Sequence, residues 1–355
     1  MALHPQSSLN NSRHPQIIAS SVHLPHKHSA TLSYSTHVPS NHGPKRCPYL
    51  LVFLSGLEQP QTAWSNVSKC LLQDYKLSAT TPPFLAYDRY GCGASSRDPS
   101  EVHVRPNTSW PETHDIFDAV QDLRQLLLYV GVMRLGYPSR ALAARDLRPV
   151  FVASSLGTFI ARLYAQFFPG SVAGLLLIDP IPIDIPLIDT ISDLESPDFD
   201  ARSLPEGVTK EMCVGAKESI KKSRFHHEVK NREGLRWGNV WTWIPNAQGP
   251  VLKGPREQGR RVEVTVVKHD AGAGVRDFRK MFRIPEAIVK TFFMPRINQY
   301  HEALPNIAGK KRGKGPLVAI GAGHNPHIET PDFIVTEMQD LLERILRAKS
   351  CRSNL

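Results

Sequence analysis

The chain has 355 residues, of which 41% are hydrophobic and 21% are charged, and its formal net charge is +10 at pH 7. This size allows one large or two ordinary globular domains with a sizeable core. Its basic runs are short and separate and are not interleaved with aromatic residues: Lys45-Arg46, Lys221-Lys222 and Lys310-Lys311-Arg312. We interpret the charge as a solvated surface and predict no nucleic-acid partner.

The cysteines argue against disulfides and metal. There are five, they are scattered, and no two have CxxC spacing: Cys47, Cys70, Cys92, Cys213 and Cys351. This pattern favours reduced thiols in an intracellular compartment, and it predicts neither a metal nor a cofactor.

The two ends of the chain bear on localisation. The N-terminus lacks the apolar core of a signal peptide, and no stretch reaches ~18 uninterrupted apolar residues, so we expect no membrane insertion and a cytoplasmic protein. The last residues, Ser353-Asn354-Leu355, are similar to a peroxisomal Ser-Lys-Leu signal, although Asn354 replaces the basic residue. A peroxisomal address is therefore the alternative. The sequence predicts no oligomeric state.

The predicted elements alternate along the chain. Residues 1–27 are rich in His, Pro, Ser and Asn, and we predict that they are poorly ordered. Apolar or alternating runs predict strands over 29–38, 48–56, 84–93, 150–154, 172–180, 261–270 and 315–324. Helical periodicity predicts helices over 64–75, 115–130, 158–168 and 331–349. The alternation predicts an α/β protein with a mostly parallel sheet covered on both faces.

One long segment interrupts this order. Residues 181–258 carry many prolines, mixed charge and the cluster "WGNVWTWIP", and they are too numerous for a simple loop. We interpret them as a lid inserted into a core formed by residues 28–180 and 259–349, with 350–355 as a free tail. Ligands of open α/β sheets bind at the carboxyl ends of the strands, so we expect the site there.

The strongest motif is "VASSLG", which joins the strand over 150–154 to the following helix. A nucleophile elbow turns so sharply that the residues two before and two after the nucleophile must be small. Around Ser155 these residues are Ala153 and Gly157. In the usual Gly-x-Ser-x-Gly pattern, glycine occupies the place that Ala153 has here. The turn therefore predicts Ser155 as a nucleophile at the positive end of a helix.

A base and an oxyanion hole are also predicted. His324, in "GAGHNPH", follows the last strand on a glycine-flanked loop from which its imidazole can reach across the sheet edge to the serine. An oxyanion hole takes one N–H from the loop after the strand over 48–56 and one from the residue after the nucleophile. Leu57 and Leu156 occupy these two places.

Over about residues 45–349 the sequence resembles the α/β-hydrolase superfamily. The segments that carry the resemblance are "LVFLSGL", "AYDRYGCGASS", "VASSLGTFIARLYAQFFPGSVAGLLLIDP" and "GAGHNPHIETPDFIV". The long polar N-terminus, the high content of Pro and His, and the segment "YDRYGCGASS" are similar to those of fungal members of the serine-nucleophile type. The resemblance implies an eight-stranded, largely parallel sheet with flanking helices, a lid after the sixth strand, and hydrolysis without a metal or an organic cofactor.

The acid of the implied triad has two candidates. Members of the superfamily carry it after either of two neighbouring strands, which here end in Asp179 and Asp270. "LLLIDP" is similar to the setting of the first kind, whereas "KHDAG" lacks the usual Gly-x-x-Asp of the second. We take Asp179 as the acid and keep Asp270 as the alternative.

These residues predict a serine hydrolase that acts on an ester or thioester through an acyl-enzyme. Epoxide hydrolases and haloalkane dehalogenases share the fold but need a carboxylate where Ser155 stands. The lid residues Trp237, Trp241 and Trp243 suggest an apolar acyl group, or else they pack the lid onto the sheet. A role in fungal secondary metabolism is a further expectation. The alternative function is a catalytically silent binding protein with the same fold.

Overall fold

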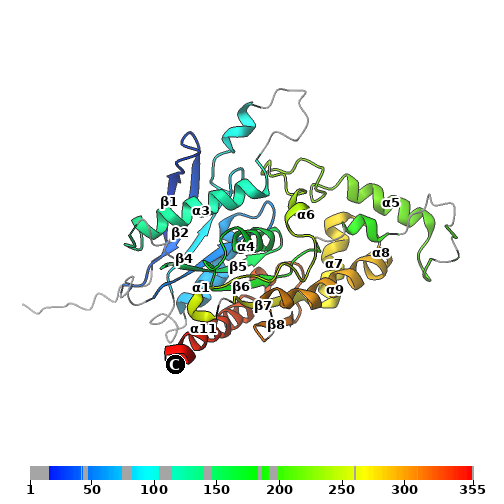
Figure 1. Cartoon of the computed structure of the whole chain (residues 1–355). Helices are drawn as coiled ribbons and strands as arrows, with labels where there is room; N and C mark the ends of the chain where they lie inside the picture. The colour runs from blue at the N-terminus through cyan, green and yellow to red at the C-terminus, as the bar shows by residue number, and fades with distance from the viewer. Residues whose placement is uncertain are drawn as a thin grey trace, which may run out of the picture.

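The computed structural model describes residues 16–353 except 41, 43–46, 74–81, 104–113, 139–145, 183–185, 192–198, 201, 203, 260 and 310. Its centre is an eight-stranded sheet in the order β1-β2-β4-β3-β5-β6-β7-β8, drawn in Figure 1. The pairs β1–β2 and β2–β4 are antiparallel, and the remaining neighbours are parallel. The strands are β1 Ile18–His23, β2 Thr31–His37, β3 Tyr49–Leu54, β4 Phe84–Tyr87, β5 Arg148–Ser154, β6 Gly174–Ile178, β7 Glu263–His269 and β8 Gly313–Ala319.

The central strands are buried on both faces because their sequences are continuous apolar runs. Every residue of β3 and β6 is buried, and β5 has only its first residue partly exposed. Helices α3 and α4 pack on one face of the sheet, and α1 and α11 pack on the other. These helices are α1 Ser65–Gln73, α3 Ile116–Met133, α4 Leu156–Phe167 and α11 Pro331–Ser353, and short α10 Pro326–Glu329 precedes α11. The α/β architecture with an eight-stranded, largely parallel sheet is as predicted.

A cap lies beside the sheet, on the side away from β1 (Figure 1). Between β6 and β7 it contains α5 Lys210–Lys221 and α6 Val240–Trp243, and between β7 and β8 it contains α7 Ala271–Phe282, α8 Glu286–Ile288, a π-helical turn Val289–Phe293 and α9 Met294–Ala303. Residues of both segments share one hydrophobic cluster, including Cys213, Ile220, Phe278, Phe282 and Phe293. We define the cap as the described residues within 181–258 and 271–308. The prediction assigned the second segment to the core, because its helices were not recognised.

Short 3₁₀ turns complete the described chain. They are Gln61–Trp64, Pro99–His103, Leu187–Thr190, Arg256–Gln258 and Leu304–Ala308.

Two predictions about the chain ends are wrong for the described residues, which do not include 1–15. Residues 18–23, predicted to be poorly ordered, form strand β1, which pairs with β2 from Ile18↔Thr36 to His23↔Thr31. Strand β1 is an edge strand with one covered face, so its sequence carries little apolar signal. Helix α11 extends to Ser353 and thus includes most of the predicted free tail, while Asn354 and Leu355 lie outside the described residues.

Candidate active site

Ser155 stands at a sharp turn between β5 and α4. Its backbone has φ 49° and ψ −120°, an unfavourable conformation for a residue with a side chain, and its N–H donates to Ile178 O. A Cβ at Gly157 would lie 2.3 Å from Leu54 O, so a larger residue has no room there. Ala153 is also fully buried. This geometry matches the small-residue requirement of a nucleophile elbow.

His324 bridges Ser155 and Asp179. Its Nε2 lies 3.0 Å from Ser155 Oγ, and its Nδ1 lies 2.6 Å from Asp179 Oδ2. Since a carboxylate only accepts, Nδ1–H donates to Asp179 and leaves Nε2 free to accept from the serine. All three side chains are nearly buried, so bulk water competes little for these hydrogen bonds.

The loop that carries His324 is anchored by Asp277, which is not among the site residues predicted from the sequence. Asp277 of α7 accepts a hydrogen bond from His324 N at 2.8 Å through Oδ2. A Cβ at Gly323 would lie 1.9 Å from the same oxygen, so a larger residue there would displace the Asp277 carboxylate from His324 N. The cap segment after β7 therefore helps to place His324.

Asp179 is shared by two histidines. Its Oδ1 accepts from His269 Nδ1 at 2.7 Å and from His269 N at 3.1 Å, while Oδ2 faces His324. Burial alone would raise the pKa of Asp179, but the two imidazoles outweigh burial and hold this pKa well below its usual range. In return, Asp179 raises the pKa of His269 against the effect of burial.

A third histidine lies behind this pair. His301 Nε2 donates to Pro180 O at 2.8 Å, and burial lowers the pKa of His301 to about 4. Neither His269 nor His301 is among the site residues predicted from the sequence. His269 directly precedes Asp270 at the end of a buried strand, which was the available signal; His301 lies on α9, and no sequence pattern links it to the site.

Asp270 has a different role in the structure. Its Oδ1 accepts from Gly272 N at 3.0 Å and from Ala273 N at 3.3 Å, so it is the N-cap of α7. The His324 imidazole thus contacts the carboxylate of Asp179, whereas that of Asp270 is held by the first turn of α7.

Leu57 and Leu156 both line a cavity of about 250 Å³ together with Ser155 and His324. Leu156 is the first residue of α4, where an N–H has no partner within the helix. The loop after β3 lies against the serine, since a Cβ at Gly56 would be 3.3 Å from Ser155 Cβ. Much of the remaining cavity wall is apolar, with Phe159, Ile181, Phe225, Trp237 and Met281.

The three lid tryptophans have different surroundings. Trp237 lines the cavity with Ser155. Trp241 lies beside it, with ring centroids 5.8 Å apart, and lines a smaller cavity of about 50 Å³. Trp243 is 43% exposed and packs on Phe117 and Phe167, at centroid distances of 6.1 and 5.1 Å. Trp243 therefore fits the alternative expectation, in which a lid tryptophan packs the lid onto the core, because α3 and α4 provide its partners and it does not line the cavity with Ser155.

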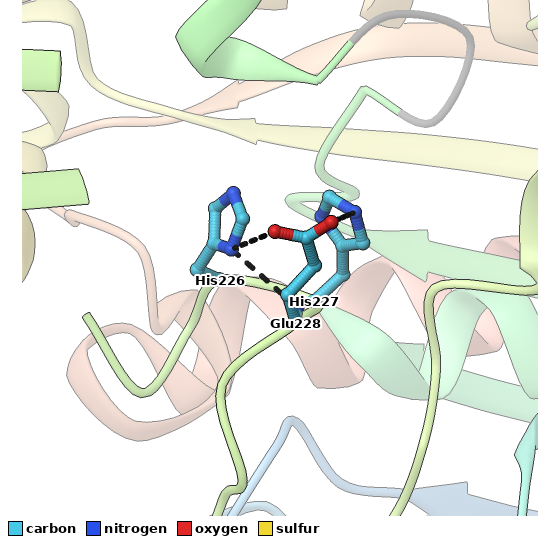
Figure 2. A group of neighbouring side chains, drawn as sticks. All are labelled: His226, His227 and Glu228. Atoms are coloured by element: carbon cyan, nitrogen blue, oxygen red, sulfur yellow. Dashed lines mark hydrogen bonds and ion pairs between the residues drawn. The ribbon is translucent and has the colours of Figure 1, made fainter. Parts of the chain in front are cut away.

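Among the described residues, one group has metal-ligand chemistry. His226, His227 and Glu228 are consecutive in the cap, and the carboxylate of Glu228 lies 4.0 Å from His226 Nδ1 and 3.9 Å from His227 Nε2 (Figure 2). These three residues line a separate cavity together with Lys217 and Lys221. The positive charges of the two lysines are unfavourable for binding a cation there. None of the three residues lines the cavity that contains Ser155.

Comparison with known proteins identifies the family. The model of the alpha/beta hydrolase family matches residues 51–337, which is most of the chain. The chain belongs to this family. No curated protein sequence matches it.

Several solved structures are similar to this chain at low identity. A mutant of VrEH2 in complex with SNO is similar at 13% identity and a TM-score of 0.50, over 92% of this chain and 99% of that one. A loop variant of haloalkane dehalogenase DbeA from Bradyrhizobium elkanii has 15% identity, a TM-score of 0.49, and coverage of 95% and 100%. A structure from work on carboxylesterases of the thaumarchaeon Nitrososphaera gargenis has 15% identity, a TM-score of 0.49, and coverage of 92% of this chain and 99% of that one. At 13% identity, the likeness to VrEH2 shows the fold alone.

Within the described part of the alpha/beta hydrolase chain, no helix has the length and apolar character needed to cross a membrane.

Proposed function

We propose that this family member is a serine hydrolase that cleaves an ester or thioester of an apolar acyl group. Ser155 is the nucleophile, His324 the general base and Asp179 the acid that orients it. The observation that carries the proposal is the continuous hydrogen-bond chain from Ser155 Oγ through His324 to Asp179 Oδ2, with distances of 3.0 and 2.6 Å.

The proposed reaction has two steps. His324 Nε2 takes the Ser155 proton while Oγ attacks the carbonyl carbon, and the N–H groups of Leu57 and Leu156 bind the oxyanion. The protonated His324 then gives its proton to the leaving oxygen or sulfur. A water molecule, deprotonated by His324, cleaves the acyl-enzyme and regenerates Ser155.

One observation favours an acyl substrate over the other reactions of this fold, and a second bears on the nature of the acyl group. Epoxide opening and dehalogenation on this scaffold need a carboxylate at the elbow, and here the residue is Ser155. The cavity beside it is lined by Phe159, Phe225 and Trp237, which suit an apolar acyl chain. A place in fungal secondary metabolism and a cytoplasmic or peroxisomal address stay predictions.

The test is hydrolysis of p-nitrophenyl esters of increasing acyl length. We expect Ser155→Ala to lose about four orders of magnitude or more in kcat/KM, whereas the neighbouring Ser154→Ala, as the matched control, keeps most of the activity. Wild-type turnover in Ser155→Ala would overturn the assignment.

A further inference from the structure

A buried ion pair connects the cap to the loop after β4. Arg89 follows β4, and Glu233 belongs to the cap, 144 residues later in the chain. Arg89 Nε donates to Glu233 Oε2 at 2.8 Å, and Nη2 donates to Oε1 at 2.7 Å. The Glu233 side chain is fully buried and that of Arg89 is 5% exposed. Such a two-point pair fixes both distance and orientation.

The same pair grips the loop that carries Leu57. Arg89 Nη1 donates to Ser55 O at 2.8 Å, and Nη2 donates to Gly56 O at 2.6 Å. On the other side of Leu57, the N–H of Glu58 donates to Glu233 Oε1. Each neighbour of Leu57 is thus tied to one member of the ion pair.

The bond to Gly56 O has a geometric consequence. The carbonyl of Gly56 and the N–H of Leu57 belong to one trans peptide, in which the two groups point in opposite directions. A carbonyl drawn toward Arg89 therefore directs the Leu57 N–H away from Arg89. Leu57 and Ser155 line the same cavity.

The cap holds this loop through other atoms as well. Glu58 Oε1 accepts from Arg232 N at 2.7 Å, and Glu58 Oε2 pairs with Arg224 Nε at 3.1 Å. At Gly91, near Arg89, a Cβ would lie 2.3 Å from Glu233 O, so the backbone of the cap fits closely against the loop after β4.

We propose that Glu233, acting through Arg89, is a positioning residue that orients the Gly56–Leu57 peptide so that its N–H completes the oxyanion hole. The cap is then a part of the catalytic machinery and not only a cover over the cavity. This inference rests on the proposed function, in which the Leu57 N–H binds the oxyanion.

The test compares Glu233→Gln with Glu263→Gln. Glu263 is a matched control because, like Glu233, it is buried and forms ion pairs with arginine, in this case Arg312 and Arg344. It is the first residue of β7 and so lies at the amino end of that strand, whereas the site lies at the carboxyl ends of the strands. Loss of one oxyanion donor lowers kcat about 10²- to 10³-fold. For a misoriented donor in Glu233→Gln we expect about 10- to 100-fold with KM little changed.

Both variants lose a buried charge, so both should be less stable, and a drop in Tm alone decides nothing about positioning. Glu263→Gln should keep kcat within about twofold of wild type. Unchanged kcat in Glu233→Gln, or an equal loss in Glu263→Gln, would overturn the proposal.

A second measurement does not depend on activity. Hydrogen exchange of the amides over residues 55–59 should become faster in Glu233→Gln and stay unchanged in Glu263→Gln. A glutamine amide offers one neutral acceptor oxygen in place of two charged ones, and its NH2 group cannot accept from Arg89, so the loop is held more weakly. If the wild-type protein has no Ser155-dependent turnover, the proposed function fails, and this measurement alone then decides whether Glu233 positions the loop. Unchanged exchange would overturn that role.

Discussion

Asp179 and Asp270 follow two neighbouring parallel strands, β6 and β7, at the same edge of the sheet, yet their carboxylates have different partners. Asp179 has φ 44°, is buried, and contacts His324 and His269. Asp270 has φ −66° and ψ 137° and caps α7. What differs between them is the backbone after each aspartate, and this decides where the carboxylate can go.

The residues that follow explain the difference. After Asp270 comes Ala-Gly-Ala-Gly, and the free amides of Gly272 and Ala273 at the start of a helix capture the carboxylate. After Asp179 comes Pro-Ile-Pro, where Pro180 and Pro182 have no N–H to donate. The Asp179 carboxylate is left to the imidazoles of His324 and His269.

The largest expected effect is on activity. Asp179→Asn should lower kcat by about 10⁴-fold, because an amide in place of the carboxylate favours the wrong tautomer of His324. Asp270→Asn should keep kcat within about twofold, since asparagine also caps helices. Steady-state kinetics on a p-nitrophenyl ester measure both. Equal losses, or a larger loss in Asp270→Asn, would reverse the roles assigned to the two aspartates.

A second expected effect concerns the pH dependence of stability. The lowered pKa of Asp179 means that its contribution is present above its ordinary value of 3.8 and is lost as pH falls through the lowered pKa. The raised pKa of His269 means that its contribution is present below the ordinary 6.5 and is lost as pH rises through the raised pKa. The pair should therefore stabilise the fold most between about pH 4 and 6.5.

Urea denaturation of wild type and His269→Gln measures this contribution. The difference in the free energy of unfolding should be larger at pH 5.5 than at pH 9, and the same trend should survive in an Asp270→Asn background. In an Asp179→Asn background it should disappear. A difference that is independent of pH would contradict an ionic contact between Asp179 and His269.

The smallest expected effect is on thermal stability, through the N-cap residue of α7. Asp270→Ala removes the acceptor of Gly272 N and Ala273 N and should lower Tm by about 1–3 °C, with little change in kcat. Thermal unfolding followed by circular dichroism, with Asp270→Asn as the control that keeps a capping side chain, measures it. An unchanged Tm would mean that the Asp270 N-cap contributes nothing to the stability of the fold.

The pair of aspartates also shows how far the sequence could predict this molecule. Periodicity and the spacing around Ser155 predict the strands, the turn and the side chains near it, since these depend on local patterns. The contacts of Asp179 with His269 and of Glu233 with Arg89 join residues 90 and 144 positions apart. No local pattern specifies such a pairing. Strand β1 was missed for a related reason, because it is defined by its partner β2.

The most direct measurement is the rate at which a fluorophosphonate labels the protein, with the adduct located by peptide mass spectrometry. We predict a single adduct on Ser155 in wild type, the same rate in Asp270→Asn, and a rate at least about 100-fold lower in Asp179→Asn, because the label needs the serine activated by an oriented histidine. An adduct elsewhere, or equal rates in wild type and Asp179→Asn, would contradict a Ser155–His324–Asp179 triad.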